Sequence, residues 1–159
     1  MKPGKNFNLV LRSSPAKAIT RADDNWLVIG GGSRFRIVKP KGGNPDYVGV
    51  QDVDTEHYWT IRWRGPVGDL HGVVLSSPED DGELAPYQRF KFEEVTSGAN
   101  GSEKSYWIKE STKGEYVSVG HNGVIVRWAR GDGSTQVFTM KMIRGASSSI
   151  EQQSASSIQ

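Results

Sequence analysis

The sequence contains no cysteine, so the chain has neither a disulfide framework nor a thiol nucleophile. It also lacks long apolar runs. No stretch approaches the roughly 20 apolar residues of a membrane-spanning helix, and the N-terminal MKPGKNFNLVLRSS has no apolar segment typical of a secretory signal. We therefore expect no membrane span and a cytoplasmic or nuclear location, while a processed secreted form would share these features.

Neither positive nor negative charge is in large excess. Twenty Lys and Arg side chains stand against 18 Asp and Glu, which leaves a formal net charge of +2. The segment Y-W-T-I-R-W-R interleaves aromatic and basic residues, as single-stranded nucleic-acid sites do, but acidic clusters lie near it in the sequence. The balance predicts no nucleic-acid partner.

Motifs of catalysis are absent as well. The chain has no G-x-S-x-G elbow, and Gly30–Ser33 lacks the lysine of a phosphate-binding loop, which favours a tight hairpin turn there. The acidic runs at 52–56 and 79–83 lack the residue placement of a calcium loop. None of the three histidines, His57, His71 and His121, has a metal-ligand spacing. We expect a non-enzymatic protein with no metal and no cofactor.

Apolar residues recur with a period near two, in short runs bounded by Gly, Pro, Asn, Asp and Ser. This pattern is typical of half-buried β-strands and predicts no helix of ten residues or more. The predicted strands are Phe7–Arg12, Lys17–Arg21, Trp26–Ile29, Arg34–Lys39, Tyr47–Gln51, Tyr58–Trp63, Gly72–Ser76, Arg89–Val95, Ser105–Lys109, Glu115–Val119, Val124–Trp128 and Val137–Ile143. Twelve short, evenly spaced strands indicate a barrel or a sandwich.

A repeated strand favours the barrel. Three segments are alike, S-R-F-R-I-V, Q-R-F-K-F-E and Q-V-F-T-M-K, with Phe35, Phe90 and Phe138 at the same place. In each, the residue two positions later is also apolar, so each strand has one inward face. We predict an all-β β-trefoil of about twelve strands in three pseudo-repeats, whose three phenylalanines meet in one interior. A Greek-key β-sandwich is the alternative.

The predicted domain spans residues 1–143. The Ser-rich segment 144–159 lacks the apolar density needed to pack, so we expect a flexible tail.

The candidate site comes from aromatic and polar residues near turns. A sugar stacks its apolar face on an aromatic ring, while its hydroxyl groups need polar partners. Trp59 and Trp63 alternate with the polar face of their strand and are expected in the core. The turn V-G-H-N-G exposes His121 and Asn122, one hairpin from Trp128 and Arg130, although a type I′ turn at Asn122 explains the same residues. The full candidate set is His121, Asn122, Trp128, Arg130, Tyr58, Arg62 and His71.

The order of features also resembles a family. F-R-I-V-K-P, Y-V-G-V-Q-D-V-D-T-E-H-Y-W-T-I-R-W, S-S-P-E-D-D-G-E and F-K-F-E-E-V follow one another as in amaranthin-type agglutinin domains of plant lectins. The order of strands is similar over about residues 7–143, and the individual residues are similar over about 35–95. The family's usual Trp and Cys before the second Phe strand are replaced here by Pro86–Arg89.

This resemblance implies a lectin that binds glycans or glycoproteins through galactose-type sugars, often as a homodimer. Two other trefoil groups are similar in part. F-K-F-E-E-V resembles Kunitz-type inhibitors, which would make a protease the partner, with Arg34, Arg64 or Arg89 as the contact residue. The segment from Gly114 to Ile125 resembles fascin-like domains, which would imply a cytoskeletal partner.

Overall fold

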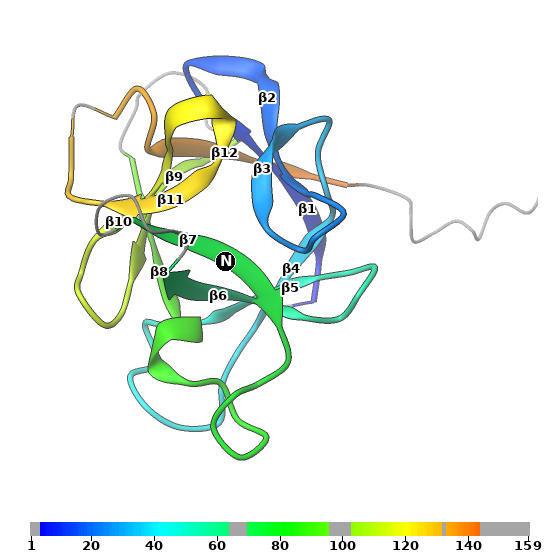
Figure 1. Cartoon of the computed structure of the whole chain (residues 1–159), viewed down its shortest axis with the longest axis vertical. Coiled ribbons are helices and arrows are strands. Elements are labelled where there is room, and N and C mark those ends of the chain that lie inside the picture. The colour runs from blue at the N-terminus through cyan, green and yellow to red at the C-terminus, as the bar shows by residue number, and fades with distance from the viewer. Residues whose placement is uncertain (1–3, 64–69, 96–102, 132, 144–159) are drawn as a thin grey trace, which may run out of the picture.

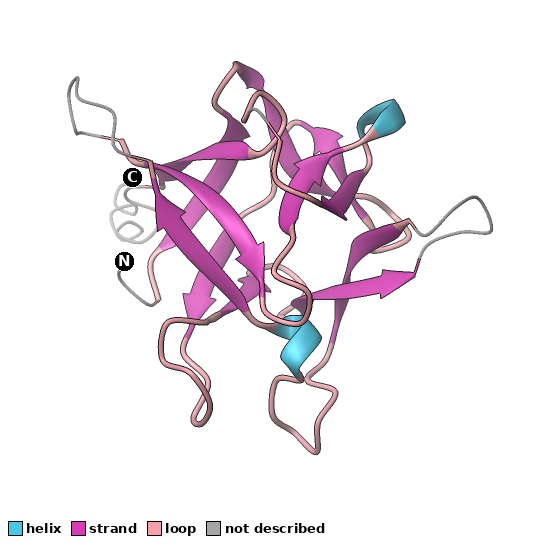
Figure 2. Cartoon of the chain, turned by 90° about the vertical axis from the view of Figure 1, so that its left-hand side faces the viewer, coloured by secondary structure: helices cyan, strands magenta, loops and turns pink. Residues whose placement is uncertain are grey.

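The computed structural model describes residues 4–63, 70–95, 103–131 and 133–143. Strands dominate these residues, and the two short 3₁₀ turns, Pro86–Gln88 and His121–Gly123, lie at the surface (Figure 2). The strands are β1 (Asn6–Leu11), β2 (Ser14–Arg21), β3 (Leu27–Gly30), β4 (Phe35–Val38), β5 (Gly49–Asp52), β6 (Tyr58–Trp63), β7 (His71–Ser76), β8 (Phe90–Glu94), β9 (Ser105–Glu110), β10 (Tyr116–Val119), β11 (Ile125–Trp128) and β12 (Val137–Met142). Each of the twelve predicted strands is present, with small differences at its ends.

Six strands close into a barrel. β1 pairs with β4 and β12, β4 with β5, and β9 with β8 and β12. The bridge between Val48 and Phe90 joins the start of β5 to β8 and completes the ring. Every strand of the barrel therefore has a neighbour on both sides.

The other six strands form three hairpins, β2–β3, β6–β7 and β10–β11, which cover one end of the barrel. The hairpins contact one another in a triangle: β7 pairs with β11, Trp26 bridges Val74, and Val28 bridges Val124 (Figure 1). Each unit thus contributes two barrel strands and one hairpin. This is the pseudo-threefold arrangement expected from the sequence, and the sandwich alternative is wrong because one sheet closes on itself.

The three phenylalanines of the repeat share one core. Phe35, Phe90 and Phe138 are fully buried in a single apolar cluster. Trp59 links two of them, with its ring centroid 5.3 Å from that of Phe35 and 5.6 Å from that of Phe90, both edge to face. The pairs that join the first and fourth strands of each unit are equivalent: Phe7 with Phe35, Val48 with Phe90, and Tyr106 with Phe138.

Two local expectations are wrong. Trp63 does not enter the core but is 55% exposed, because β6 and β7 pair as far as Trp63 and His71, beyond the last core residues of the hairpin. Gly30–Gly32 do not form a hairpin turn. β3 pairs with β2, and these glycines connect β3 to β4. Gly32 has φ +109° and donates its backbone N–H to Thr20 Oγ1, so glycine is favoured there.

Among the described residues, no helix is long and apolar enough to cross a membrane. The predicted tail 144–159 and Arg64 lie outside the described residues.

Candidate functional site

The predicted type I′ turn is present at the tip of the β10–β11 hairpin. Asn122 has φ 58° and ψ 24°, Gly123 has φ 74°, and the Val124 N–H donates to the His121 carbonyl at 3.3 Å. His121 and Asn122 are exposed. Their exposure follows from the turn geometry.

Trp128 lies at the opposite end of the same hairpin. Val119 pairs with Ile125 beside the turn, whereas Tyr116 pairs with Trp128 three residues further along. At about 3.4 Å per residue, this places Trp128 roughly 10 Å from the turn. The structure therefore does not bring His121 and Asn122 together with Trp128, because the hairpin separates them along its length.

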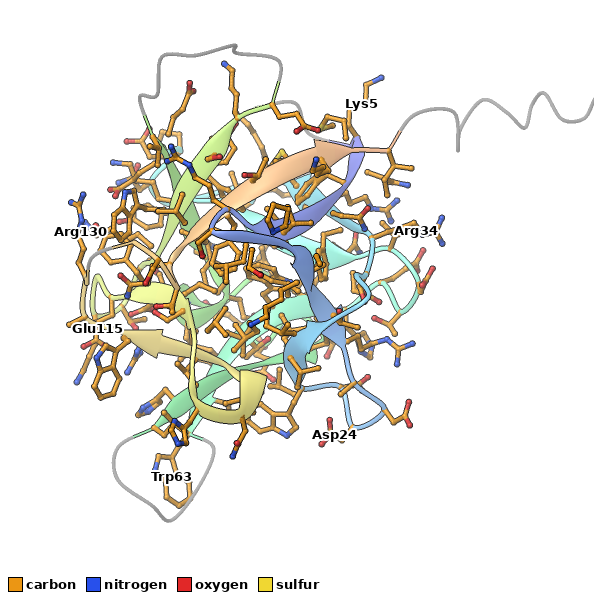
Figure 3. The ribbon with its side chains drawn as sticks, turned by 90° about the horizontal axis from the view of Figure 1, so that it is seen from above. Lys5, Asp24, Arg34, Trp63, Glu115 and Arg130 are labelled. Carbon is orange, nitrogen blue, oxygen red and sulfur yellow. The ribbon has the colours of Figure 1, made fainter. Side chains whose placement is uncertain are left out.

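Trp128 and Arg130 instead belong to an aromatic surface on the third unit. Trp128 is 59% exposed, and Tyr116 lies directly across the strand pair. Tyr116 packs edge to face on Trp107, with ring centroids 5.5 Å apart. The Arg130 guanidinium lies 4.2 Å above the Trp107 ring and 6.0 Å from that of Tyr116. Figure 3 shows Arg130 and Glu115 on the same side of the molecule. We call Trp107, Tyr116, Trp128 and Arg130 the aromatic surface.

Polar contacts with neighbouring side chains fix the position of the aromatic surface. The Tyr116 hydroxyl donates to Glu93 Oε1 at 3.0 Å. Burial raises the pKa of Tyr116, and this hydrogen bond together with the charge of Glu93 raises it further. Beside Tyr116, the Arg127 guanidinium pairs with Glu110 at 3.4 Å and Glu115 at 3.1 Å. These contacts fix the backbone that carries Trp128.

Glu110 also organises the turn between β9 and β10. Its Oε2 accepts from the Thr112 N–H at 2.8 Å and from the Thr112 hydroxyl at 2.6 Å, and its Oε1 accepts from the Lys113 N–H at 2.6 Å. The equivalent residue in the second unit, Asp52, accepts from the N–H and hydroxyl of Thr55 in the same way. Both carboxylates are therefore turn caps buried within the fold.

Arg62 and His71 meet elsewhere, at the end of the β6–β7 hairpin where β6 stops and β7 begins. With Trp63, Tyr87, Thr112 and Arg127 they line a shallow pocket of about 310 Å³. Arg62 forms an ion pair with Glu79. Burial alone would raise the pKa of Glu79, but hydrogen bonds from Ser76, Arg62 and Tyr87 outweigh it and lower the pKa below its ordinary value. Tyr58 begins β6 at the other end of the strand, so the structure does not bring it into this pocket.

The sequence does not predict a further pocket, of about 750 Å³. It lies between the β4–β5 and β7–β8 connections, and its lining includes Lys41, Asn44, Tyr47, Asp80 and Glu83. These connections are far apart in sequence, and no motif in the sequence relates one to the other. Only the register of the barrel places them together.

The Arg89 side chain spans this pocket and hydrogen-bonds to both connections. Its guanidinium donates to the Leu84 carbonyl at 2.9 and 3.1 Å and to the Gly42 carbonyl at 2.5 Å. Gly43 has φ +84°, and a Cβ there would meet the Arg89 guanidinium, so glycine is favoured. Arg89 is thus committed to the fold, and Arg34 forms an ion pair with Asp54. Neither arginine has the free side chain expected of a protease contact.

The pseudo-threefold symmetry shows what is special about Trp128. In each unit a hydroxyl on the second strand, from Thr20, Thr60 or Ser118, donates to the carbonyl two residues earlier. The residues opposite those carbonyls are Gly30, Ser76 and Trp128. One of three equivalent positions therefore carries an exposed aromatic ring, and the other two carry small residues.

No model of a known protein family and no curated protein matches this sequence. Solved structures do match. The designed threefold-symmetric protein ThreeFoil has a TM-score of 0.65 at 15% identity over 87% of this chain and 99% of its own. The BEL beta-trefoil has a TM-score of 0.65 at 14% identity over 90% of this chain and 96% of its own.

The chain is a β-trefoil. A lectin of Polyporus squamosus, bound to Neu5Acα2-6Galβ1-4GlcNAc, also matches, with a TM-score of 0.62, 13% identity and coverage of 88% of this chain. The present chain spans about half of that lectin, 49% of its length. At such identities the likeness establishes the trefoil fold alone, so the amaranthin-type resemblance stays a prediction. Among the described residues of this trefoil, no three His, Asp or Glu side chains cluster as metal ligands would.

Proposed function

We propose that this trefoil is a non-catalytic carbohydrate-binding module and that Trp128 is its stacking platform. The observation that supports the proposal is the exposed indole at a position where the other two units have Gly30 and Ser76. An exposed indole offers an apolar face on which a sugar ring can stack.

The surroundings of Trp128 suit a sugar. The apolar face of a pyranose ring would cover the indole, while its hydroxyl groups would bond with Arg130 and Glu115, charged groups that form strong hydrogen bonds. Trp107 and Tyr116 are packed and hydrogen-bonded before any ligand arrives, so little conformational entropy is lost on binding. The Polyporus squamosus lectin, which contains this fold and is bound to a sugar epitope, adds support.

Under this proposal the partners are glycans or glycoproteins. The preferred sugar, a homodimer and a cytoplasmic or nuclear location stay predictions.

The test is a glycan array with the full chain, followed by calorimetric titration of the best ligand with two variants. Trp128→Ala should weaken binding by about 2 kcal/mol, roughly thirtyfold, because it removes the stacked area. Trp63→Ala is the matched control, since Trp63 is exposed to a similar degree on a different hairpin. It should bind as the parent does, with both variants folded by circular dichroism.

Loss of binding in Trp63→Ala with retention in Trp128→Ala would move the site to the pocket of Arg62 and His71. Absence of any bound glycan at millimolar concentration would end the proposal.

A further inference from the structure

A row of side chains crosses four strands and the segment before β5, and it includes part of the aromatic surface. Lys91 on β8 pairs with Lys109 on β9, Lys109 pairs with Tyr116 on β10, and Tyr116 pairs with Trp128 on β11. Because Val48 bridges Phe90, the preceding Tyr47 lies opposite Lys91. We call Tyr47, Lys91, Lys109, Tyr116 and Trp128 the cross-strand row.

The barrel members of the cross-strand row lie on the outer face of their strands and are partly exposed, whereas Tyr116 is buried, with 8% of its surface exposed. These barrel members alternate with Val48, Phe90 and Ile108, which are all buried in the apolar cluster. Successive strands are about 4.8 Å apart, so the row is roughly 20 Å long. At one end stands the exposed Trp128, and at the other Tyr47 lines the 750 Å³ pocket. A ligand that follows the row would therefore be an extended chain of several units.

The centre of the row holds two like charges. Lys91 and Lys109 are directly opposite each other, an arrangement that destabilises a strand pair unless something offsets it. None of the ion pairs found in the described parts of the chain includes either lysine. The nearest acid on the same face of β8 is Glu93, whose Oε1 already accepts from Tyr116. Arg130 adds a third positive charge over Trp107.

We propose that the cross-strand row binds an acidic oligosaccharide, with a carboxylate or sulfate group between Lys91 and Lys109 and a sugar ring on Trp128. This inference rests on the proposed carbohydrate-binding function and names its ligand class. An anion between the two ammonium groups removes their repulsion and gains two charge-assisted hydrogen bonds.

A single-stranded nucleic acid is also anionic and stacks on aromatic rings. It carries one phosphate per nucleotide, however, and the row is bordered by Glu93 and Glu115 and by Asp80 and Glu83 in the pocket. A regular series of phosphates would meet these carboxylates, whereas a glycan can carry its charge at one sugar and hydroxyl groups at the next.

The experiment measures binding of tetrasaccharides or longer fragments of polygalacturonate, alginate, hyaluronan and heparin to the full chain, each beside its carboxyl-reduced or desulfated form. At least one acidic fragment should bind, with its neutralised form binding at least fivefold more weakly. Lys91→Ala/Lys109→Ala should remove this difference and leave binding of the neutral form unchanged. Lys17→Ala/Lys39→Ala carries the same change of charge on exposed residues of the first unit and is the matched control. This control variant should keep the parent's preference for the acidic fragment over its neutralised form.

The outcomes separate the two proposals. If Trp128→Ala abolishes binding but acidic and neutral forms bind alike, or the double lysine variant is unchanged, the ligand class is wrong and carbohydrate binding stands. If no glycan binds, both proposals fall. If oligo(dT) or oligo(U) binds through Lys91 and Lys109 more tightly than every acidic glycan, the row is a nucleic-acid site and this inference is overturned.

Discussion

The second and third units share a buried scaffold but differ in the surface they present. In both, a glutamine two residues before the core phenylalanine ties the hairpin to the barrel: Gln88 hydrogen-bonds to Thr60, and Gln136 to Ser118. The position opposite the hairpin tyrosine is nevertheless Ser76 in one and Trp128 in the other. The symmetric core positions three similar hairpins, which differ in the residues that they expose.

The first unit is the plainest of the three. Ser33 takes the place of the glutamines and accepts only the Arg21 N–H, and Leu11 takes the place of the buried carboxylates. Its barrel strands still close the ring, which indicates that apolar packing is sufficient for the fold and that the polar scaffold refines it.

The largest expected effect is loss of a core phenylalanine. Phe35→Ala, Phe90→Ala and Phe138→Ala should each lower the free energy of unfolding by about 3 to 5 kcal/mol, because each leaves a cavity in the same cluster. Urea denaturation measures this. Phe92→Ala, at a partly buried site, is the control and should cost less. A cost below 1 kcal/mol for any of the three would contradict their equivalence.

Next in size is the glutamine scaffold. Gln88→Met and Gln136→Met should each destabilise the protein by about 2 to 3 kcal/mol, since the substitution removes the side-chain carbonyl that accepts from the Ala85 N–H or the Gly131 N–H. Ser33→Ala should cost about 1 kcal/mol. Chemical denaturation measures the free energy of unfolding of each variant. If all three substitutions lower it equally, the polar contacts of the first unit stabilise the protein as much as those of the other two, contrary to this prediction.

The smallest effect concerns Glu79, which accepts hydrogen bonds from Ser76 and Arg62. Its folded pKa is lowered from 4.5, so its contribution is complete above pH 4.5 and is lost as the pH falls through the folded value. Glu79→Gln should destabilise by about 0.5 kcal/mol at pH 7, because solvent screens the exposed Arg62. Urea midpoints of parent and variant should converge progressively as the pH falls below 4.5. A gap that widens on acidification would show that the pKa is raised.

Strand positions could be predicted from the sequence because alternation and turn residues are local signals. The shared burial of Phe35, Phe90 and Phe138 followed from their repetition. The segments Y-V-G-V at 47 and Y-V-S-V at 116 are alike in sequence but not equivalent in the fold, since Tyr47 precedes a barrel strand and Tyr116 begins a hairpin. Half-buried strands share this alternation of residues, so a likeness between such short segments does not show that they are equivalent.

The candidate site depends on register, which local pattern does not contain. Trp128 and Arg130 were identified as residues, but their neighbours Trp107 and Tyr116 come from pairing across three strands. The opposed lysines of the cross-strand row and the pocket crossed by Arg89 depend in the same way on loops whose lengths differ between units.

The barrel has one narrow seam. Five residue pairs join β1 to β12, whereas the described contact between β5 and β8 is the bridge at Val48 and Phe90, with backbone hydrogen bonds of 2.7 and 2.8 Å. Transient opening of the wall should begin here, and deuterium should reach these two amides before those of β1 and β12. The large pocket lies against this seam, so an occupant that contacts Tyr47 would hold the wall shut and slow the exchange of both amides.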